Sequence, residues 1–153
     1  DIAWQKLPLA NAKSTLVLTY DTRGQDLPVV QRDDVKFSSD ASYLVTGGFG
    51  CFGQKTAEWL VHHGARHLVL TGRTGADNDA RKAFVAKLEE AGATVLAAAC
   101  DPADIEQLRM LFNRIEKDMP PLKGVFHSGA VIIDQPINEI ELPIFRQVMQ
   151  SKA

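Results

Sequence analysis

Short apolar runs alternate with amphipathic stretches along the chain from residue 42 onward. The runs contain four or five residues each and lie at residues 43–46, 67–71, 94–98 and 124–127. Runs of this length, rich in aliphatic and β-branched side chains, predict buried β-strands. After each run, apolar side chains recur every three or four residues, which is the spacing of a helix with one buried face.

Four helices are predicted from this spacing. The first spans residues 52–63 and ends at Gly64, since glycine is common just past a helix end. Its inward side is expected to carry Phe52, Thr56, Leu60 and His63. The second helix follows a cap at Asp77 or Asn78 and ends at Gly92.

The third helix is expected to open at Asp101 or Ala103 and to stop before Pro120 and Pro121. Its inward side chains are Ile105, Leu108, Leu111, Phe112 and Ile115. A last helix carries Ile140, Ile144 and Val148 at four-residue spacing.

A strand–helix unit repeated four times predicts an α/β fold with a Rossmann-like, doubly wound parallel sheet. Apolar strands that alternate with amphipathic helices indicate a sheet covered on both faces. Right-handed crossovers then favour the strand order 3-2-1-4. Such a sheet binds ligands at the carboxyl ends of its strands, near the point where the strand order reverses.

The first 41 residues follow a different pattern. Residues 15–20 form a β-branched and aromatic run that predicts a strand, and a turn-rich stretch comes next. We therefore divide the chain into an end strand within residues 1–23, a linker at 24–41, and the repeating α/β part at 42–153.

The composition is that of a single soluble globular domain. The chain has 153 residues, 45% of them hydrophobic and 24% charged, with a formal net charge of −2. This balance disfavours nucleic acid or a membrane surface as a partner. The two cysteines favour a reducing, cytoplasmic compartment. The histidines and cysteines lack the spacing of metal ligands.

A glycine-rich turn links the first strand to the first helix. It comprises Thr46, Gly47, Gly48, Phe49, Gly50, Cys51, Phe52 and Gly53. A Gly-x-Gly-x-x-Gly pattern lets a pyrophosphate approach the backbone and the helix N-terminus closely. The alternative is a glycine turn without a ligand, but the strand–turn–helix context favours a dinucleotide.

Residues at the ends of the other strands refine this prediction. Thr71 and Arg73 follow the second strand, where NAD enzymes usually carry an acidic residue. An arginine suits a 2′-phosphate, so NADPH is favoured over NADH, unless Arg73 is only a solvated surface residue. Asp101, after the third strand, either contacts the adenine or caps a helix. The fourth strand ends in His127, Ser128 and Gly129, where small residues would admit the nicotinamide ribose or simply pack tightly.

Several of these segments resemble the ketoreductase domains of polyketide synthases and animal-type fatty acid synthases, within the short-chain dehydrogenase/reductase superfamily. The resemblance extends over residues 41–153 and rests on segments 43–50, 59–70, 92–95 and 123–127. It implies NADPH-dependent reduction of a β-ketoacyl group, carried on an acyl carrier protein, to a β-hydroxyacyl group. It also implies neighbouring synthase domains as partners.

The resemblance assigns roles residue by residue. It matches the glycines to the phosphate loop, Arg73 to the 2′-phosphate contact and Asp101 to the adenine contact. Lys152 stands where the family has its active-site lysine, although a lysine at a helix C-terminus also suits the helix dipole. The family's catalytic serine and tyrosine lie beyond this lysine. We therefore expect these 153 residues to bind cofactor without turnover.

Residues 9–18 faintly resemble the closing segment of an enoyl reductase domain, which would make the first strand part of a preceding domain. Two function classes remain open: the cofactor-binding half of a ketoreductase, and a non-catalytic Rossmann module that serves as a structural platform within a multienzyme. The intact glycine loop and Arg73 favour the first.

Overall fold

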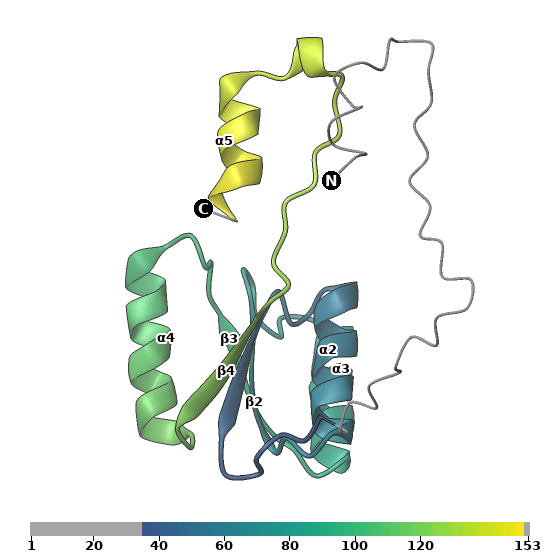
Figure 1. Cartoon of the computed structure of the whole chain (residues 1–153), viewed down its shortest axis with the longest axis vertical. Coiled ribbons are helices and arrows are strands. Elements are labelled where there is room, and N and C mark those ends of the chain that lie inside the picture. Colours follow the sequence, from purple (N-terminus) through teal and green to yellow (C-terminus); the bar gives the residue numbers. More distant parts are fainter. Residues whose placement is uncertain (1–34, 152–153) are drawn as a thin grey trace, which may run out of the picture. The chain divides into compact units, whose positions relative to one another are not determined.

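The computed structural model describes residues 35–151, which form a four-stranded parallel sheet with helices on both sides (Figure 1). The strands are β1 (Ser42–Thr46), β2 (His67–Gly72), β3 (Thr94–Ala99) and β4 (Leu122–His127). Their order is β3-β2-β1-β4, and every neighbouring pair is parallel. The predicted Rossmann-like fold and strand order are confirmed. The strand predicted at residues 15–20 lies outside the described residues.

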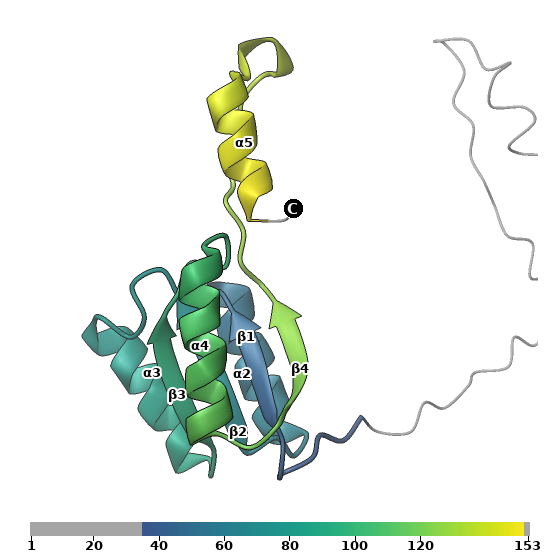
Figure 2. The same cartoon turned by 90° about the vertical axis from the view of Figure 1, so that its left-hand side faces the viewer.

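The helices are α2 (Cys51–His62), α3 (Asp79–Glu90), α4 (Ile105–Asp118) and α5 (Leu142–Gln150), with a short 3₁₀ helix, η2, at Ile137–Glu139. Helices α2 and α3 lie on one face of the sheet and α4 lies on the other, as Figures 1 and 2 show. An extended segment without regular structure leads from β4 to η2 and α5. No helix within residues 35–151 is both long and apolar enough to cross a membrane.

The helix ends follow local chemistry. Gly64 follows the end of α2 with a φ of +104°, a conformation that suits glycine because it lacks a Cβ atom. The side chain of Asn78 caps α3 by accepting a hydrogen bond from the Arg81 N–H. Of the two caps predicted for this helix, Asn78 is therefore the correct one.

The prediction that Phe52 faces inward from α2 is wrong. Phe52 is 82% exposed, and the buried residues of the helix are Gly53, Ala57, Leu60 and Val61. Gly53 packs directly on the glycine turn. This contact fixes the rotation of α2 about its axis and leaves Phe52 on the solvent side.

Helix α4 also begins later than predicted. Its cap is Asp104, which accepts hydrogen bonds from the N–H groups of Glu106 and Gln107. Leu111 and Ile115 are buried, whereas Ile105 and Phe112 are 60% and 43% exposed. The predicted start at Asp101 or Ala103 is wrong because Asp101 belongs to a turn that precedes the helix. Ile140, placed in the last helix by its spacing, precedes α5.

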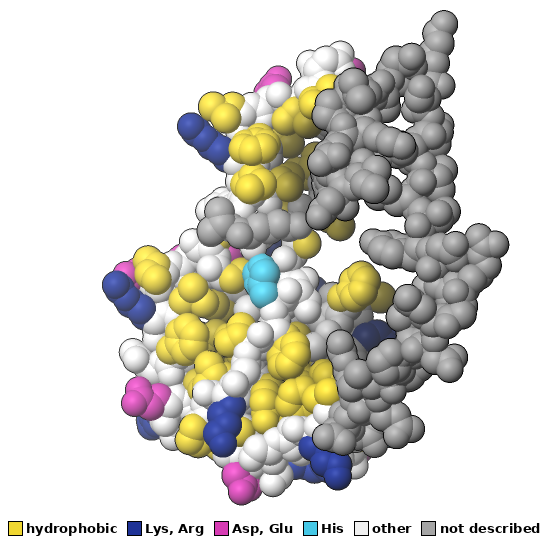
Figure 3. All heavy atoms as spheres, in the orientation of Figure 1, with side chains coloured by type: hydrophobic (Ala, Val, Ile, Leu, Met, Phe, Trp, Pro, Cys, Tyr) yellow, Lys and Arg dark blue, Asp and Glu magenta, His cyan; other side chains and the backbone are white. Residues whose placement is uncertain are grey.

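The core consists of two layers divided by the sheet. Alternate residues of the central strands face opposite ways, so that Val45 and Leu70 pack toward α2 and α3 while Leu44 and Val69 pack with α4 residues. Strand β4 departs from the predicted coverage, since its residues alternate between half-buried and exposed and Val125 is 55% exposed. Figure 3 shows hydrophobic side chains at the surface on this side of the molecule.

Candidate functional site

A cavity of about 390 Å³ lies at the carboxyl ends of the strands. Its wall is built from the glycine turn after β1, Gly72 at the end of β2 and Arg73 after it, residues 100–103 after β3, residues 128–131 after β4, and the end of α5. This is the position that a doubly wound sheet offers a ligand. The volume lies within the range of small-molecule and cofactor sites.

Backbone hydrogen bonds hold these strand ends together. The Gly48 N–H donates to the Thr71 carbonyl at 2.8 Å, the Cys100 N–H donates to the Gly72 carbonyl at 3.0 Å, and the Ser128 N–H donates to the Thr46 carbonyl at 3.0 Å. All four strands are therefore connected at the cavity. These bonds also satisfy main-chain groups at the ends of the strands.

The glycine turn contains close backbone contacts that leave no room for a Cβ atom. A Cβ atom on Gly47 would lie 2.8 Å from the Gly129 nitrogen, and Gly47 has a φ of +66°. A Cβ atom on Gly53 would collide with the Gly47 carbonyl oxygen and lie 2.7 Å from the Gly48 Cα. Glycine at these two positions therefore lets the turn pack closely on Gly129 and on the first turn of α2.

The N-terminus of α2 is suited to an anion. Gly50 precedes the helix, no side chain caps it, and its first turn contains no acidic residue. Helices α3 and α4 differ, since each has a side-chain cap and an acidic residue in the first turn. Helix α5 resembles α2 in lacking both, but its N-terminus does not line the cavity. The N–H groups and the positive dipole end of α2 are therefore available to a phosphate group.

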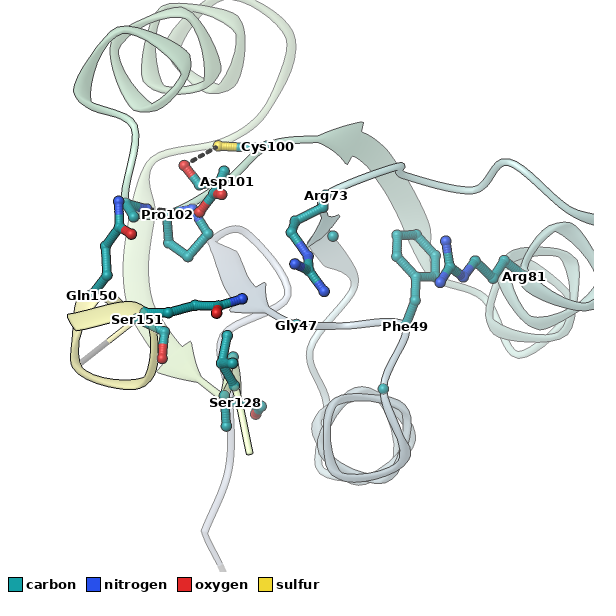
Figure 4. A pocket seen from close by; sticks show the side chains of 17 residues that line it. Gly47, Phe49, Arg73, Arg81, Cys100, Asp101, Pro102, Ser128, Gln150 and Ser151 are labelled. Carbon is teal, nitrogen blue, oxygen red and sulfur yellow. Dashed lines mark hydrogen bonds between the residues drawn. The ribbon is translucent and has the colours of Figure 1, made fainter. Parts of the chain in front are cut away.

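Two arginines line the cavity. Figure 4 shows Arg73 pointing into the space between Gly47 and Asp101. Arg73 is exposed, and it forms no hydrogen bond or ion pair with another residue of the 35–151 segment. With respect to the described residues, its guanidinium group can therefore bind a phosphate through two hydrogen bonds.

The second arginine, Arg81, was not predicted from the sequence as a residue of the site. It lies 5.6 Å from the centre of the Phe49 ring and donates hydrogen bonds to Thr74 Oγ1, the Gly75 carbonyl and Asp77 Oδ1. Partial desolvation raises the pKa of Asp77, but the hydrogen bond with Thr74 and the charge of Arg81 outweigh this effect, so its pKa lies below the ordinary value. Arg81 shapes the turn after β2 and adds positive charge at the cavity. The only indication in the sequence is that Arg81 lies in the first turn of the helix that follows Arg73.

Asp101 lies in the cavity wall and stabilises the turn after β3. Its Oδ1 atom accepts a hydrogen bond from the Ala103 N–H at 3.0 Å, and its own N–H donates to Gln107 Oε1 at 2.9 Å. Its other carboxylate oxygen has no hydrogen-bond partner among residues 35–151 and can accept one from a ligand. The neighbouring Cys100 is buried, and burial raises its pKa, with a smaller contribution from the negative charges of Asp101 and Asp104.

The predicted cofactor residues divide into two groups. Those that line the cavity are Gly47, Phe49, Gly50, Arg73, Asp101, Ser128 and Gly129. Those that do not line it are Thr46, Gly48, Cys51, Phe52, Gly53, Thr71 and His127. Thr46 and Thr71 are buried, with exposed fractions of 5% and 1%, so that their contribution to the site is structural support. Lys152 lies outside the described residues.

The last turn of α5 contributes Gln147, Gln150 and Ser151 to the wall, none of which was predicted from the sequence. In Figure 4, Gln150 and Ser151 lie across the cavity from Phe49 and Arg81. No group of three or more histidine, cysteine or acidic side chains that could hold a metal occurs in the described part of the chain.

Comparison with known proteins assigns most of the chain to one protein family. The KR domain family model matches residues 41–153. The chain belongs to the ketoreductase (KR) domain family of polyketide synthases. This family is part of the short-chain dehydrogenase/reductase superfamily, and the predicted resemblance is confirmed.

Curated relatives and solved structures agree with the ketoreductase assignment. A highly reducing polyketide synthase of Aspergillus terreus is 34% identical over 99% of this chain, and the partially reducing polyketide synthase men1 of Menisporopsis theobromae is 32% identical over 99%. The chain spans only 6% of the length of each. A structure of A-type ketoreductases from a modular polyketide synthase is 39% identical, has a TM-score of 0.71, and is matched over 78% of this chain and 25% of its own.

Proposed function

We propose that this chain supplies the NADPH site for reduction of a β-ketoacyl thioester on an acyl carrier protein to the β-hydroxyacyl thioester. The observation that carries the proposal is the meeting of three features in one cavity: the glycine turn, the uncapped N-terminus of α2, and an Arg73 side chain without a partner among residues 35–151. When bound, NADPH supplies the hydride for this reduction.

The residues present fit this cofactor. The glycine turn and the first N–H groups of α2 would hold the pyrophosphate. Arg73 would bind the 2′-phosphate, and the free carboxylate oxygen of Asp101 would accept a hydrogen bond from the adenine amino group. Ser128 and Gly129 would lie against the ribose of the nicotinamide.

A structural platform without a ligand is the alternative. A platform would gain from a capped α2 and from a paired arginine, because an uncapped helix end forgoes about 1 kcal/mol of stabilisation. The chain caps α3 and α4 with side chains, and it leaves both α2 and α5 without a side-chain cap. Of the two uncapped helix N-termini, only that of α2, through Gly50, lines the cavity. This difference supports cofactor binding over the platform.

The proposal extends to the cellular setting. The curated relatives are much longer synthases, which supports a multienzyme in which enoyl reductase and acyl carrier domains are the partners. Both cysteines are free thiols, which supports a reducing, cytoplasmic location.

Parallel titrations with NADPH and NADH test the cofactor proposal. Wild-type chain should prefer NADPH, and Arg73→Ala should weaken NADPH binding by about 10- to 100-fold, as expected for loss of charged hydrogen bonds worth roughly 1.5–3 kcal/mol. NADH binding should change little, since NADH lacks the 2′-phosphate.

The matched control is Arg109→Ala. Arg109 is an exposed arginine of α4 that pairs with Glu106 and does not line the cavity. It should leave both affinities unchanged. Equal affinity of the wild-type chain for the two cofactors, or equal effects of the two arginine variants, would contradict the proposal. No binding by a folded chain would favour the structural platform.

A further inference from the structure

One side chain connects α5 to the sheet. Helix α5 has no buried residue. Within residues 35–151, a single hydrogen bond joins its last turn to the strands: His127 Nε2 lies 2.7 Å from the Ser151 carbonyl oxygen. The other ring nitrogen, Nδ1, lies 2.6 Å from Thr46 Oγ1. The ring of His127 therefore links the end of β1, the end of β4 and the end of α5.

The partners determine which nitrogen carries the proton. A carbonyl oxygen only accepts hydrogen bonds, so Nε2 must donate to Ser151. Nδ1 of the neutral ring is then the acceptor, and the Thr46 hydroxyl donates to it. The Ser151 carbonyl stands at the end of α5, where carbonyl groups lack partners within the helix and a histidine donor is favourable.

This hydrogen bond holds a wall of the cavity in place. Gln147, Gln150 and Ser151 line the cavity, whereas His127 does not. We infer that His127 is a positioning residue: it fixes the last turn of α5 against the sheet and thereby completes the cofactor cavity, rather than contacting the dinucleotide as the sequence suggested. The expected effect on NADPH binding rests on the proposed function.

Two substitutions at His127 separate the two halves of the link. Glutamine places an amide donor near the position of Nε2 and can replace the bond to Ser151, whereas asparagine reaches only the position of Nδ1 near Thr46. His127→Ala and His127→Asn should weaken NADPH binding by about tenfold, the factor that corresponds to loss of one hydrogen bond of about 1.4 kcal/mol. His127→Gln should stay within about threefold of wild type. His62→Ala, at an exposed histidine of α2 outside this cavity, is the matched control and should leave NADPH affinity unchanged.

Two readouts do not depend on the cofactor. Imidazole nitrogen NMR of the wild-type chain should show His127 protonated at Nε2 and bare at Nδ1. Amide hydrogen exchange in residues 142–151 should quicken by about tenfold in the alanine and asparagine variants, and not in the glutamine variant.

The outcomes distinguish this inference from the proposed function. A proton on Nδ1 with a bare Nε2 would overturn the link to Ser151 whatever the cofactor result, and so would equal exchange in all His127 variants. If the wild-type chain binds no NADPH while the NMR and exchange results are as expected, the cofactor proposal fails and the positioning of α5 stands. If NADPH binds and alanine, asparagine and glutamine behave alike, the positioning role fails and the cofactor site stands.

Discussion

Replacing Gly53 by alanine tests the packing of α2 on the glycine turn. In an ordinary helix interior this change would stabilise the protein by about 1 kcal/mol, because alanine has the higher helix propensity. Here the added Cβ would collide with the Gly47 carbonyl oxygen and lie 2.7 Å from the Gly48 Cα. These atoms belong to the main chain, so no side chain can move aside. Helix and turn must separate.

The cost of such overpacking is typically about 1–3 kcal/mol, and rigid neighbours place this site at the upper end. After the gain in helix propensity is subtracted, we expect Gly53→Ala to destabilise the chain by about 2 kcal/mol. Urea unfolding followed by circular dichroism should show a midpoint lower by about 1 M, for a slope of about 2 kcal/mol per M. NADPH affinity should fall as well, because the turn that would hold the pyrophosphate is displaced.

Gly92→Ala is the control for a glycine substitution without a collision. Gly92 has a φ of +87°, and a Cβ atom there would meet nothing within 4 Å. It should lose about 1 kcal/mol from backbone strain alone and retain cofactor affinity. A Gly53→Ala chain as stable as wild type, or more stable, would show that helix propensity prevails and that the close packing does not limit this position.

Three further predictions concern the rest of the described domain. Hydrogen bonds from Lys55 and Lys87 lower the pKa of Glu58 to about 2 from an ordinary value of 4.5. The stabilisation of the folded chain by the Glu58 carboxylate is therefore present above pH 4.5 and is lost as the pH falls toward 2. Glu58→Gln should lower the free energy of unfolding at neutral pH by about 1 kcal/mol, allowing for solvent screening, and should flatten the acid limb of a stability–pH curve. An unchanged acid limb would contradict this. Asn78→Ala should cost about 1 kcal/mol in urea unfolding through loss of the α3 cap, with Asn78→Ser near wild type; equal losses would argue against capping. An alkylating reagent should label exposed Cys51 in the native chain, and buried Cys100, whose pKa is raised, only after unfolding; mass spectrometry showing both labelled at once would refute the burial.

Local patterns in the sequence were sufficient for the sheet and for much of the candidate site. Within residues 35–151, strands appear at all four apolar runs, and the three runs at β1, β2 and β3 are long enough and apolar enough to be covered by helices. The right-handed crossover then leaves few strand orders, and β3-β2-β1-β4 is the observed one. The glycine turn and Arg73 follow from the same logic, since each comes directly after a strand and therefore reaches the carboxyl edge of the sheet.

The remaining features arise from contacts between distant segments. The rotation of α2 is set by Gly53 against the glycine turn, which no hydrophobic spacing encodes. Arg81 reaches the cavity because its side chain lies over Phe49, a residue of another turn. His127 meets a partner 81 residues earlier in the chain and another 24 residues later. A sequence pattern indicates which side chains share one face of a helix or strand. Contacts between distant residues depend instead on how whole helices and strands pack, and only the tertiary structure brings these residues within hydrogen-bonding distance.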